Sequence, residues 1–149
     1  QRIAIAPIRT ASQVSIESDP LLKKDIRFFF EPNSSILDKT AAENLEFLDT
    51  IKRFLQVSPG STVLLRGHVD NARISEIRAQ GGDPLVQSMA LRAMELSRQR
   101  ALSVREALIE RHAQIDAARL EAVGRGWEEP ASTNSDLNRR VEVQWFTLE

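Results

Sequence analysis

After residue 24, apolar and polar residues follow the periods of strands and helices along most of the chain. The run Asp25–Glu31 carries four apolar residues, ends at Pro32-Asn33 and predicts a buried strand. In Ser61–Val69, alternate positions share a face, which predicts a second strand. Two shorter apolar runs, Leu120–Val123 and Val141–Phe146, predict the last two strands.

Two other segments have the apolar spacing of amphipathic helices. The first is expected to begin at Thr40-Ala41-Ala42-Glu43, which has the form of a capping box, and to run to about Val57. Asp83-Pro84 predicts the start of the second helix, because Asp is a good N-cap and Pro suits a first turn. This helix should run to about His112, and Gly124–Leu137 has the composition of a loop.

The predicted order is strand, helix, strand, helix, strand, strand. It indicates an α+β fold, a two-layer βαβαββ sandwich with the helices packed on one face of a small mixed sheet. One domain accounts for residues 25–149. Residues 1–24 are expected to form a linker or an added edge strand, because Pro7 argues against a central strand within the apolar stretch Arg2–Ile8.

Composition limits the classes of function. The chain has 20 Lys and Arg against 21 Asp and Glu, so no general affinity for nucleic acid or anionic lipid is expected. The absence of cysteine excludes disulfides, thiolate metal sites and cysteine nucleophiles. No apolar run approaches the roughly 20 residues that span a bilayer. Because the sequence begins at Gln1 without an initiator Met or a signal pattern, we expect a fragment of a longer precursor, with any membrane tether outside it.

The second predicted helix has an arginine inside its apolar stripe. At about 100° per residue, Arg100 lies within about 40° of five apolar residues: Met89, Ala93, Leu96, Val104 and Ala107. A buried guanidinium is costly unless it is paired, so an acidic side chain, a ligand carboxylate or both should meet Arg100. A side chain that extends to the edge of the stripe, or a structural ion pair, is an equally good interpretation. A second apolar line, Leu91, Leu102 and Ile109, lies on the opposite side.

Four segments carry motifs that occur in this order in one known family. They are the opening strand Ile26 to Leu37, then Leu65-Arg66-Gly67-His68-Val69-Asp70, then Leu96-Ser97-Arg98-Gln99-Arg100-Ala101 with Val104 and Leu108, and finally Gly124-Arg125-Gly126 and Pro130 with Asn138 to Val143. Over roughly residues 25–147 the chain resembles the OmpA-like peptidoglycan-binding domain, the family of the C-terminal domain of OmpA, of Pal and of MotB.

The resemblance implies non-covalent binding of cell-wall peptidoglycan, with neither catalysis nor a cofactor. In such domains the residues that match Asp70 and Arg100 hold the diaminopimelate of the stem peptide. The free end of diaminopimelate carries an ammonium beside a carboxylate, which suit a carboxylate and a guanidinium respectively. Without ligand, Asp70 and Arg100 could pair with each other. Further candidates for ligand contact are His68, Asn71, Ser97, Arg139 and Arg140.

The last two candidates, Arg139 and Arg140, must point to opposite faces of their strand, and one of them is expected near the site. The resemblance also implies a periplasmic location in the envelope of a Gram-negative bacterium, where the domain would anchor a larger envelope protein. Peptidoglycan is the expected partner, nucleic acid is not, and a homodimer is compatible with the sequence.

Two other functions remain open. An enzyme could use His68 and Asp70, two positions apart on a strand, as metal ligands, but His112 is the remaining histidine and no hydrolase motif is present. We therefore expect no metal and no catalysis. A protein-interaction module that has lost peptidoglycan binding is the second alternative. Val69 in place of the family's usual Thr and Ala93 in place of its Asn favour it, because each removes a polar group.

The segment Asn71–Gln87 is the largest departure from the family. It makes the connection after Asp70 roughly fifteen residues longer than usual, an insertion that costs little when it is a solvated loop. Ile74 and Ile77 are three apart and predict a short amphipathic helix before a flexible joint at Gly81-Gly82. This segment could instead line the rim of the pocket and replace the missing polar groups.

Overall fold

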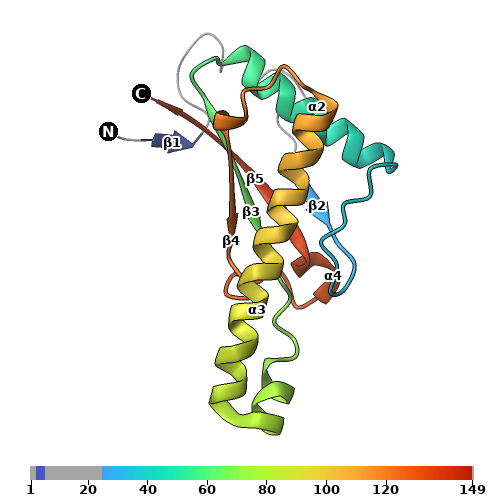
Figure 1. Ribbon diagram of the computed structural model, residues 1–149, viewed down its shortest axis with the longest axis vertical. Coiled ribbons are helices and arrows are strands. Elements are labelled where there is room, and N and C mark those ends of the chain that lie inside the picture. The colour runs from blue at the N-terminus through green and yellow to red at the C-terminus, as the bar shows by residue number, and fades with distance from the viewer. Residues whose placement is uncertain (1–2, 6–24, 149) are drawn as a thin grey trace.

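The computed structural model describes residues 3–5 and 25–148 of the chain (Figure 1). The described residues form a five-stranded sheet, two long helices, a turn of 3-10 helix and one further short helix. In chain order these are β1 (Ile3–Ile5), β2 (Arg27–Phe29), α2 (Ala42–Val57), β3 (Thr62–Gly67), α3 (Ile74–Arg111), η1 (Ala117–Arg119), β4 (Leu120–Gly124), α4 (Ser135–Asn138) and β5 (Arg140–Leu148).

The sheet is mixed, and β5 pairs with three other strands. β3 runs antiparallel to β5, with Leu65 opposite Val143, and parallel to β4, with Leu65 opposite Ala122. The other edge of β5 pairs antiparallel with β2 at residues 140–142 and with β1 at residues 146–148. The predicted α+β class and the βαβαββ order from residue 25 onward are confirmed. Of the expectation for residues 1–24, positions 6–24 lie outside the described residues.

The core lies between the sheet and the two long helices, which lie over the sheet in Figure 1. Its fully enclosed side chains come from β2, α2, β3, α3 and β5: Phe28, Leu48, Ile51, Val63, Leu65, Val104, Leu108 and Val141. Burying each of these stabilises the fold by about 1.5–3 kcal/mol, the range for a Val, Leu, Ile or Phe side chain. Phe54 stacks on Trp145 with ring centroids 5.5 Å apart and closes one end of this layer.

Two glycines allow α3 to lie directly against the sheet. A Cβ atom on Gly67 of β3 would collide with the backbone oxygen of Ser97, and one on Gly124 of β4 would lie 2.6 Å from the backbone nitrogen of Arg98. The Ser97 hydroxyl donates to the Met94 carbonyl and accepts from the N–H of Gly126, both at 2.8 Å. This contact sets the position of the next helical turn, which carries Arg100, relative to the end of β3.

The predicted capping box of the first helix is wrong. α2 begins at Ala42, after Ala41 as N-cap, and no side chain caps it. The carboxylate of Asp38 instead accepts hydrogen bonds from the backbone N–H groups of Thr40 and Ala41 and from the Thr40 hydroxyl. A turn centred on Asp38 therefore precedes the helix and takes up the hydroxyl that a capping box would use. The predicted end at Val57 is correct.

The second long helix begins where the sequence predicts. α3 spans Ile74–Arg111, but a break at Gly82, whose φ of 68° suits glycine, divides it into a short helix and a long one that resumes at Asp83. The predicted short helix and its glycine joint are confirmed, with Ile77 buried. Asp83 accepts a hydrogen bond from Arg78 Nε at 3.0 Å, across the break. The long part ends at Arg111, close to the predicted His112.

Candidate functional site

A cavity of about 320 Å³ lies beyond the end of β3, against α3 and the loop that follows β2. Asp70 and Arg100 both line it, so we call it the Asp70–Arg100 cavity. The other lining residues come from the loop after β2, the segment after β3, α3 and the start of β5: Pro32, Asn33, Val69, Ala72, Arg73, Leu96, Ser135 and Arg139. The motifs singled out Asp70 and Arg100, which are 30 positions apart in the sequence. The fold brings both of them to one concave surface.

Arg100 lines this cavity from α3, and its side chain is buried. Its guanidinium donates to three backbone carbonyls: Nε to Ser34 at 2.8 Å, Nη1 to His68 at 2.8 Å and Nη2 to Glu31 at 3.1 Å. Its central carbon lies 5.6 Å from the centre of the Phe30 ring, within the range of a cation–π contact. These neutral partners hold the guanidinium in one orientation.

No carboxylate among the described residues forms an ion pair with Arg100. The ion pair between Asp70 and Arg100 that we expected without ligand is therefore wrong, because carbonyl oxygens take the place of the acid. The other two arginines of the cavity are paired, Arg73 with Glu76 at 3.1 Å and Arg139 with Asp136 at 2.6 Å. Burial, with repulsion from Arg139, lowers the pKa of Arg100 to about 10, so the group stays charged at neutral pH.

Asp70 is oriented by hydrogen bonds to both of its oxygens. Oδ1 accepts from Nδ2 of Asn138 at 2.9 Å, and Oδ2 accepts from the backbone N–H of Ala72 at 3.2 Å. Burial raises the pKa of the Asp70 carboxyl, but hydrogen bonds from Asn138, Ser135 and the backbone outweigh it and hold the net pKa below its usual range. The carboxylate is therefore ionised and fixed in place beside the cavity.

Asn138 is the residue that the sequence analysis missed as part of the site. It is almost fully buried at the end of α4, and its Nδ2 also donates to the Ser132 carbonyl at 2.8 Å. Its Oδ1 accepts from the backbone N–H groups of Ala131 and Ser132. The signal available in the sequence was a small amide in the matched segment before β5, which the analysis used only to recognise the family.

The further candidates separate into those that line the cavity and those that support it. Arg139 lines the cavity and donates from Nε to the Phe30 carbonyl at 2.9 Å. Arg140 is buried elsewhere, where it donates to Glu142 and to the Glu129 carbonyl. Ser97 holds α3 against Gly126, Asn71 donates its backbone N–H to Asp70, and His68 contributes only its carbonyl, to Arg100.

The two-ligand metal site considered for His68 and Asp70 is not formed. β3 ends at Gly67, so the strand alternation that would place the two side chains on one face stops before Asp70. The His68 ring is buried, with Nε2 3.4 Å from Glu142 Oε1, and His112 contacts Asp49 at the far end of α3. Within the described part of the chain no three His, Cys, Asp or Glu residues form a group that could hold a metal ion.

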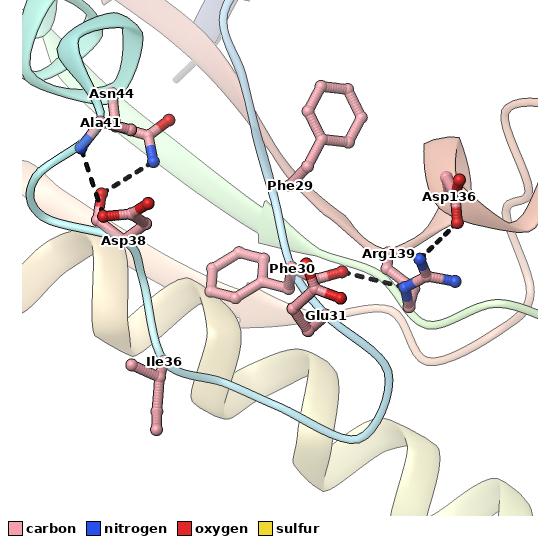
Figure 2. A pocket seen from close by; sticks show the side chains of 9 residues that line it. All are labelled: Phe29, Phe30, Glu31, Ile36, Asp38, Ala41, Asn44, Asp136 and Arg139. Carbon is pink, nitrogen blue, oxygen red and sulfur yellow. Dashed lines mark hydrogen bonds and ion pairs between the residues drawn. The ribbon is translucent and has the colours of Figure 1, made fainter.

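A larger cavity, of about 510 Å³, adjoins the first one at Arg139, which lines both. We call it the Phe29–Asn44 cavity. Figure 2 shows Asp38, Ala41 and Asn44 on one side of it and Arg139 with Asp136 on the other. Phe29, Phe30, Glu31 and Ile36 complete its lining.

The Asp70–Arg100 cavity can recognise a small zwitterion. It offers a fixed, ionised carboxylate for a cation and a charged guanidinium without an acidic partner for an anion, and charge-assisted hydrogen bonds of this kind are among the stronger ones. The geometry therefore supports the binding of such a ligand.

Comparison with known proteins finds related sequences and structures. Residues 29–144, more than half of the chain, match the profile of the OmpA family. The outer membrane protein Omp38 of Acinetobacter baumannii is 28% identical over 126 residues. That match covers 80% of this chain but 30% of Omp38, so the chain spans less than a third of this relative's length.

Solved structures show the same fold at lower sequence identity. The peptidoglycan-associated lipoprotein from Burkholderia pseudomallei superposes with a TM-score of 0.66 at 21% identity, over 87% of this chain and 98% of that one. The periplasmic domain of Helicobacter pylori MotB gives 0.58 at 21% identity, over 82% and 71%. In the residues that the structure describes, no helix has the length and apolar character needed to cross a membrane.

Proposed function

Because this chain belongs to the OmpA family, we propose that it binds peptidoglycan non-covalently, through the diaminopimelate of the stem peptide. The Asp70–Arg100 cavity is the binding site in this proposal. The family is known for peptidoglycan binding. The geometry of the site is the support for diaminopimelate as the group that is bound.

The observation that carries the proposal is the state of Arg100. A guanidinium has five N–H donors, and three of them reach carbonyl oxygens, so two remain, one on each terminal nitrogen. The charge is buried and unneutralised, which is costly for the free protein. A ligand carboxylate in the cavity would neutralise it and use the remaining donors.

Asp70 supplies the second half of the recognition. Its ionised carboxylate, fixed by Asn138, suits the ammonium that stands beside the carboxylate at the free end of diaminopimelate. The two protein charges have opposite signs and lie on one cavity, so the site is matched to a zwitterion rather than to a simple anion. A ligand with one of its charges removed should bind more weakly.

The departures from the family pattern leave both charges in place. Val69 lines the cavity as an apolar wall, and Ala93 is buried within α3 and does not line it. From the insertion, Ala72 and Arg73 reach the cavity while Ile74 begins α3. In our proposal Arg73 adds a polar group at the rim in place of the missing hydroxyl.

The proposed role follows from the family's place in the Gram-negative envelope. A domain that binds diaminopimelate in the periplasm would fix the larger protein that carries it to the cell wall. The alternative, an interaction module without ligand binding, draws on the second apolar line of α3. Of its members only Leu91 is strongly exposed, at 74%, while Ile109 packs against the core, so the line does not form a continuous surface.

Co-sedimentation with purified diaminopimelate-type sacculi tests the proposal. The parent domain should pellet with the sacculi, and the Arg100→Ala and Asp70→Ala variants should stay in solution. Arg119→Ala is the matched control, because Arg119 also donates to three carbonyls, of Leu55, Ser58 and Ser61, but lies outside the cavity. Circular dichroism verifies folding. Sedimentation of folded Asp70→Ala and Arg100→Ala proteins at the parent level would refute the site.

A further inference from the structure

The loop between β2 and α2 forms a wall of both cavities. The Glu31 and Ser34 carbonyls hold Arg100 on one side, and the Phe30 carbonyl holds Arg139, which lines both cavities. A ligand bound at Asp70 and Arg100 therefore has the Phe29–Asn44 cavity next to it. The proposed function leaves this second cavity, the larger of the two, without a role.

Two large apolar side chains of the second cavity are exposed. Phe29 is 42% and Ile36 is 82% exposed, and neither belongs to the core. Figure 2 shows them on either side of Phe30 and Glu31, so apolar surface is available along the cavity. Exposed apolar side chains that gather at a concave surface are typical of ligand sites.

The polar groups of this cavity are mostly hydrogen-bond acceptors. Asn44 donates from Nδ2 to the Asp38 carbonyl at 2.9 Å, which leaves its Oδ1 as an acceptor. Among the described residues, no donor reaches this oxygen, the Glu31 carboxylate or Oδ2 of Asp38. The cation Arg139 is already paired with Asp136 at 2.6 Å. The cavity thus offers acceptors to hydroxyl and amide donors and, with three carboxylates against one guanidinium, disfavours an anion.

We propose that the Phe29–Asn44 cavity binds a sugar of the glycan strand that carries the same stem peptide. A neutral N-acetylated sugar has hydroxyl and amide donors along its edges and C–H groups on its faces, which match the acceptors and the apolar side chains respectively. The inference rests on the proposed function, because the stem peptide places the sugar. Two amino acids separate diaminopimelate from the sugar, and at no more than ~3.6 Å per residue they span at most about 7 Å, the scale of adjoining cavities.

Titration calorimetry with two soluble ligands tests the inference. One is the free stem tripeptide that ends in diaminopimelate, and the other is the disaccharide–tripeptide. The parent should bind the disaccharide–tripeptide roughly three- to tenfold more tightly, the range for a net neutral hydrogen bond. Asn44→Ala should reduce this preference and leave affinity for the tripeptide unchanged, because Asn44 does not line the Asp70–Arg100 cavity.

Leu91→Ala is the matched control, since Leu91 is an exposed apolar residue that lines neither cavity, and it should keep the preference. Equal affinity of the parent for the two ligands would overturn the inference while leaving the proposed function intact. An equal loss for both ligands in the Asn44→Ala protein would also overturn it, because the cavity would then contact the peptide. Binding of neither ligand to the parent would overturn the proposed function and this inference together.

Discussion

Asn138 donates a hydrogen bond of 2.9 Å from Nδ2 to Oδ1 of Asp70, although 68 positions separate the two residues. The same amide closes the turn at Ala131 and Ser132, so it connects the loop before α4 to the ligand carboxylate. Asn138 is therefore a positioning residue. It would act on the ligand only through the Asp70 carboxylate, which it holds in place.

Substitutions of Asn138 should separate positioning from folding. Asn138→Ala should lower affinity for diaminopimelate and lower the free energy of unfolding by about 1–3 kcal/mol, because buried N–H groups lose their acceptor. Asn138→Asp keeps that acceptor, removes the donor and places a like charge beside Asp70, which should raise the pKa of Asp70. Calorimetric binding and urea denaturation check both. An Asn138→Asp protein with the parent's affinity and its pH dependence would show that Asn138 does not position Asp70.

Because α3 lies directly against the sheet, a methyl group added at Gly67 should lower stability strongly, and one added at Gly60 should not. Gly67→Ala should lower the free energy of unfolding by about 1–3 kcal/mol or more, because the new methyl group meets the rigid backbone at Ser97. Gly60→Ala has no atom within 4 Å of its new carbon and should change stability by about 0.5 kcal/mol or less. Urea denaturation of the two variants compares them. Equal effects would show that the close contact does not determine stability.

The burial of His68 predicts a dependence of stability on pH. Burial, with repulsion from Arg140, lowers its pKa to about 4 despite the opposing Glu142 and Glu129, whereas an unfolded histidine titrates near 6.5. Between these values the unfolded chain binds a proton that the folded domain does not. The free energy of unfolding should therefore fall as the pH drops from about 6.5 towards 4, by on the order of 3 kcal/mol in all.

His68→Gln should remove this slope. The carboxyl groups whose pKa values are lowered titrate in the unfolded chain near 4, so they contribute mainly below pH 4.5. They are Asp38, Asp49, Asp70, Glu76, Glu129 and Glu142. Urea denaturation at several pH values between 4.5 and 6.5 isolates the histidine. The same slope in the parent and in His68→Gln would contradict the assignment.

The sequence predicted the elements well because burial follows their periodicity. The stripe on α3 left open whether Arg100 is buried or extends to its edge, and it could not show what meets the guanidinium, since the carbonyls of Glu31, Ser34 and His68 belong to loops and a strand end that have no side-chain signal. Asn138 was missed for a related reason: its partners come from three separate segments. The start of the long helix after Gly82 was predicted correctly, because Asp83-Pro84 has the form of a helix start and follows a glycine with positive φ.

The rim role of the insertion can be tested directly. Replacing Arg73–Gly82 by a tight turn should weaken binding of diaminopimelate, and Arg73→Ala alone should weaken it by no more than about fivefold, because an exposed charge contributes about 1 kcal/mol at most. Titration calorimetry measures both, with circular dichroism as the check on folding. If the shortened, folded protein binds as the parent does, the insertion is a solvated loop.

The most direct test of the central claim compares the stem tripeptide that ends in diaminopimelate with the same tripeptide ending in lysine, whose side chain has the ammonium but lacks the carboxylate beside it. In titration calorimetry the parent should bind the diaminopimelate peptide roughly 10- to 150-fold more tightly than the lysine peptide, the factor for a charge-assisted hydrogen bond of about 1.5–3 kcal/mol. Arg100→Lys should lose most of this preference, because an ammonium lacks the planar fork that matches a carboxylate. Equal affinity of the parent for the two tripeptides, or an undiminished preference in Arg100→Lys, would contradict the account.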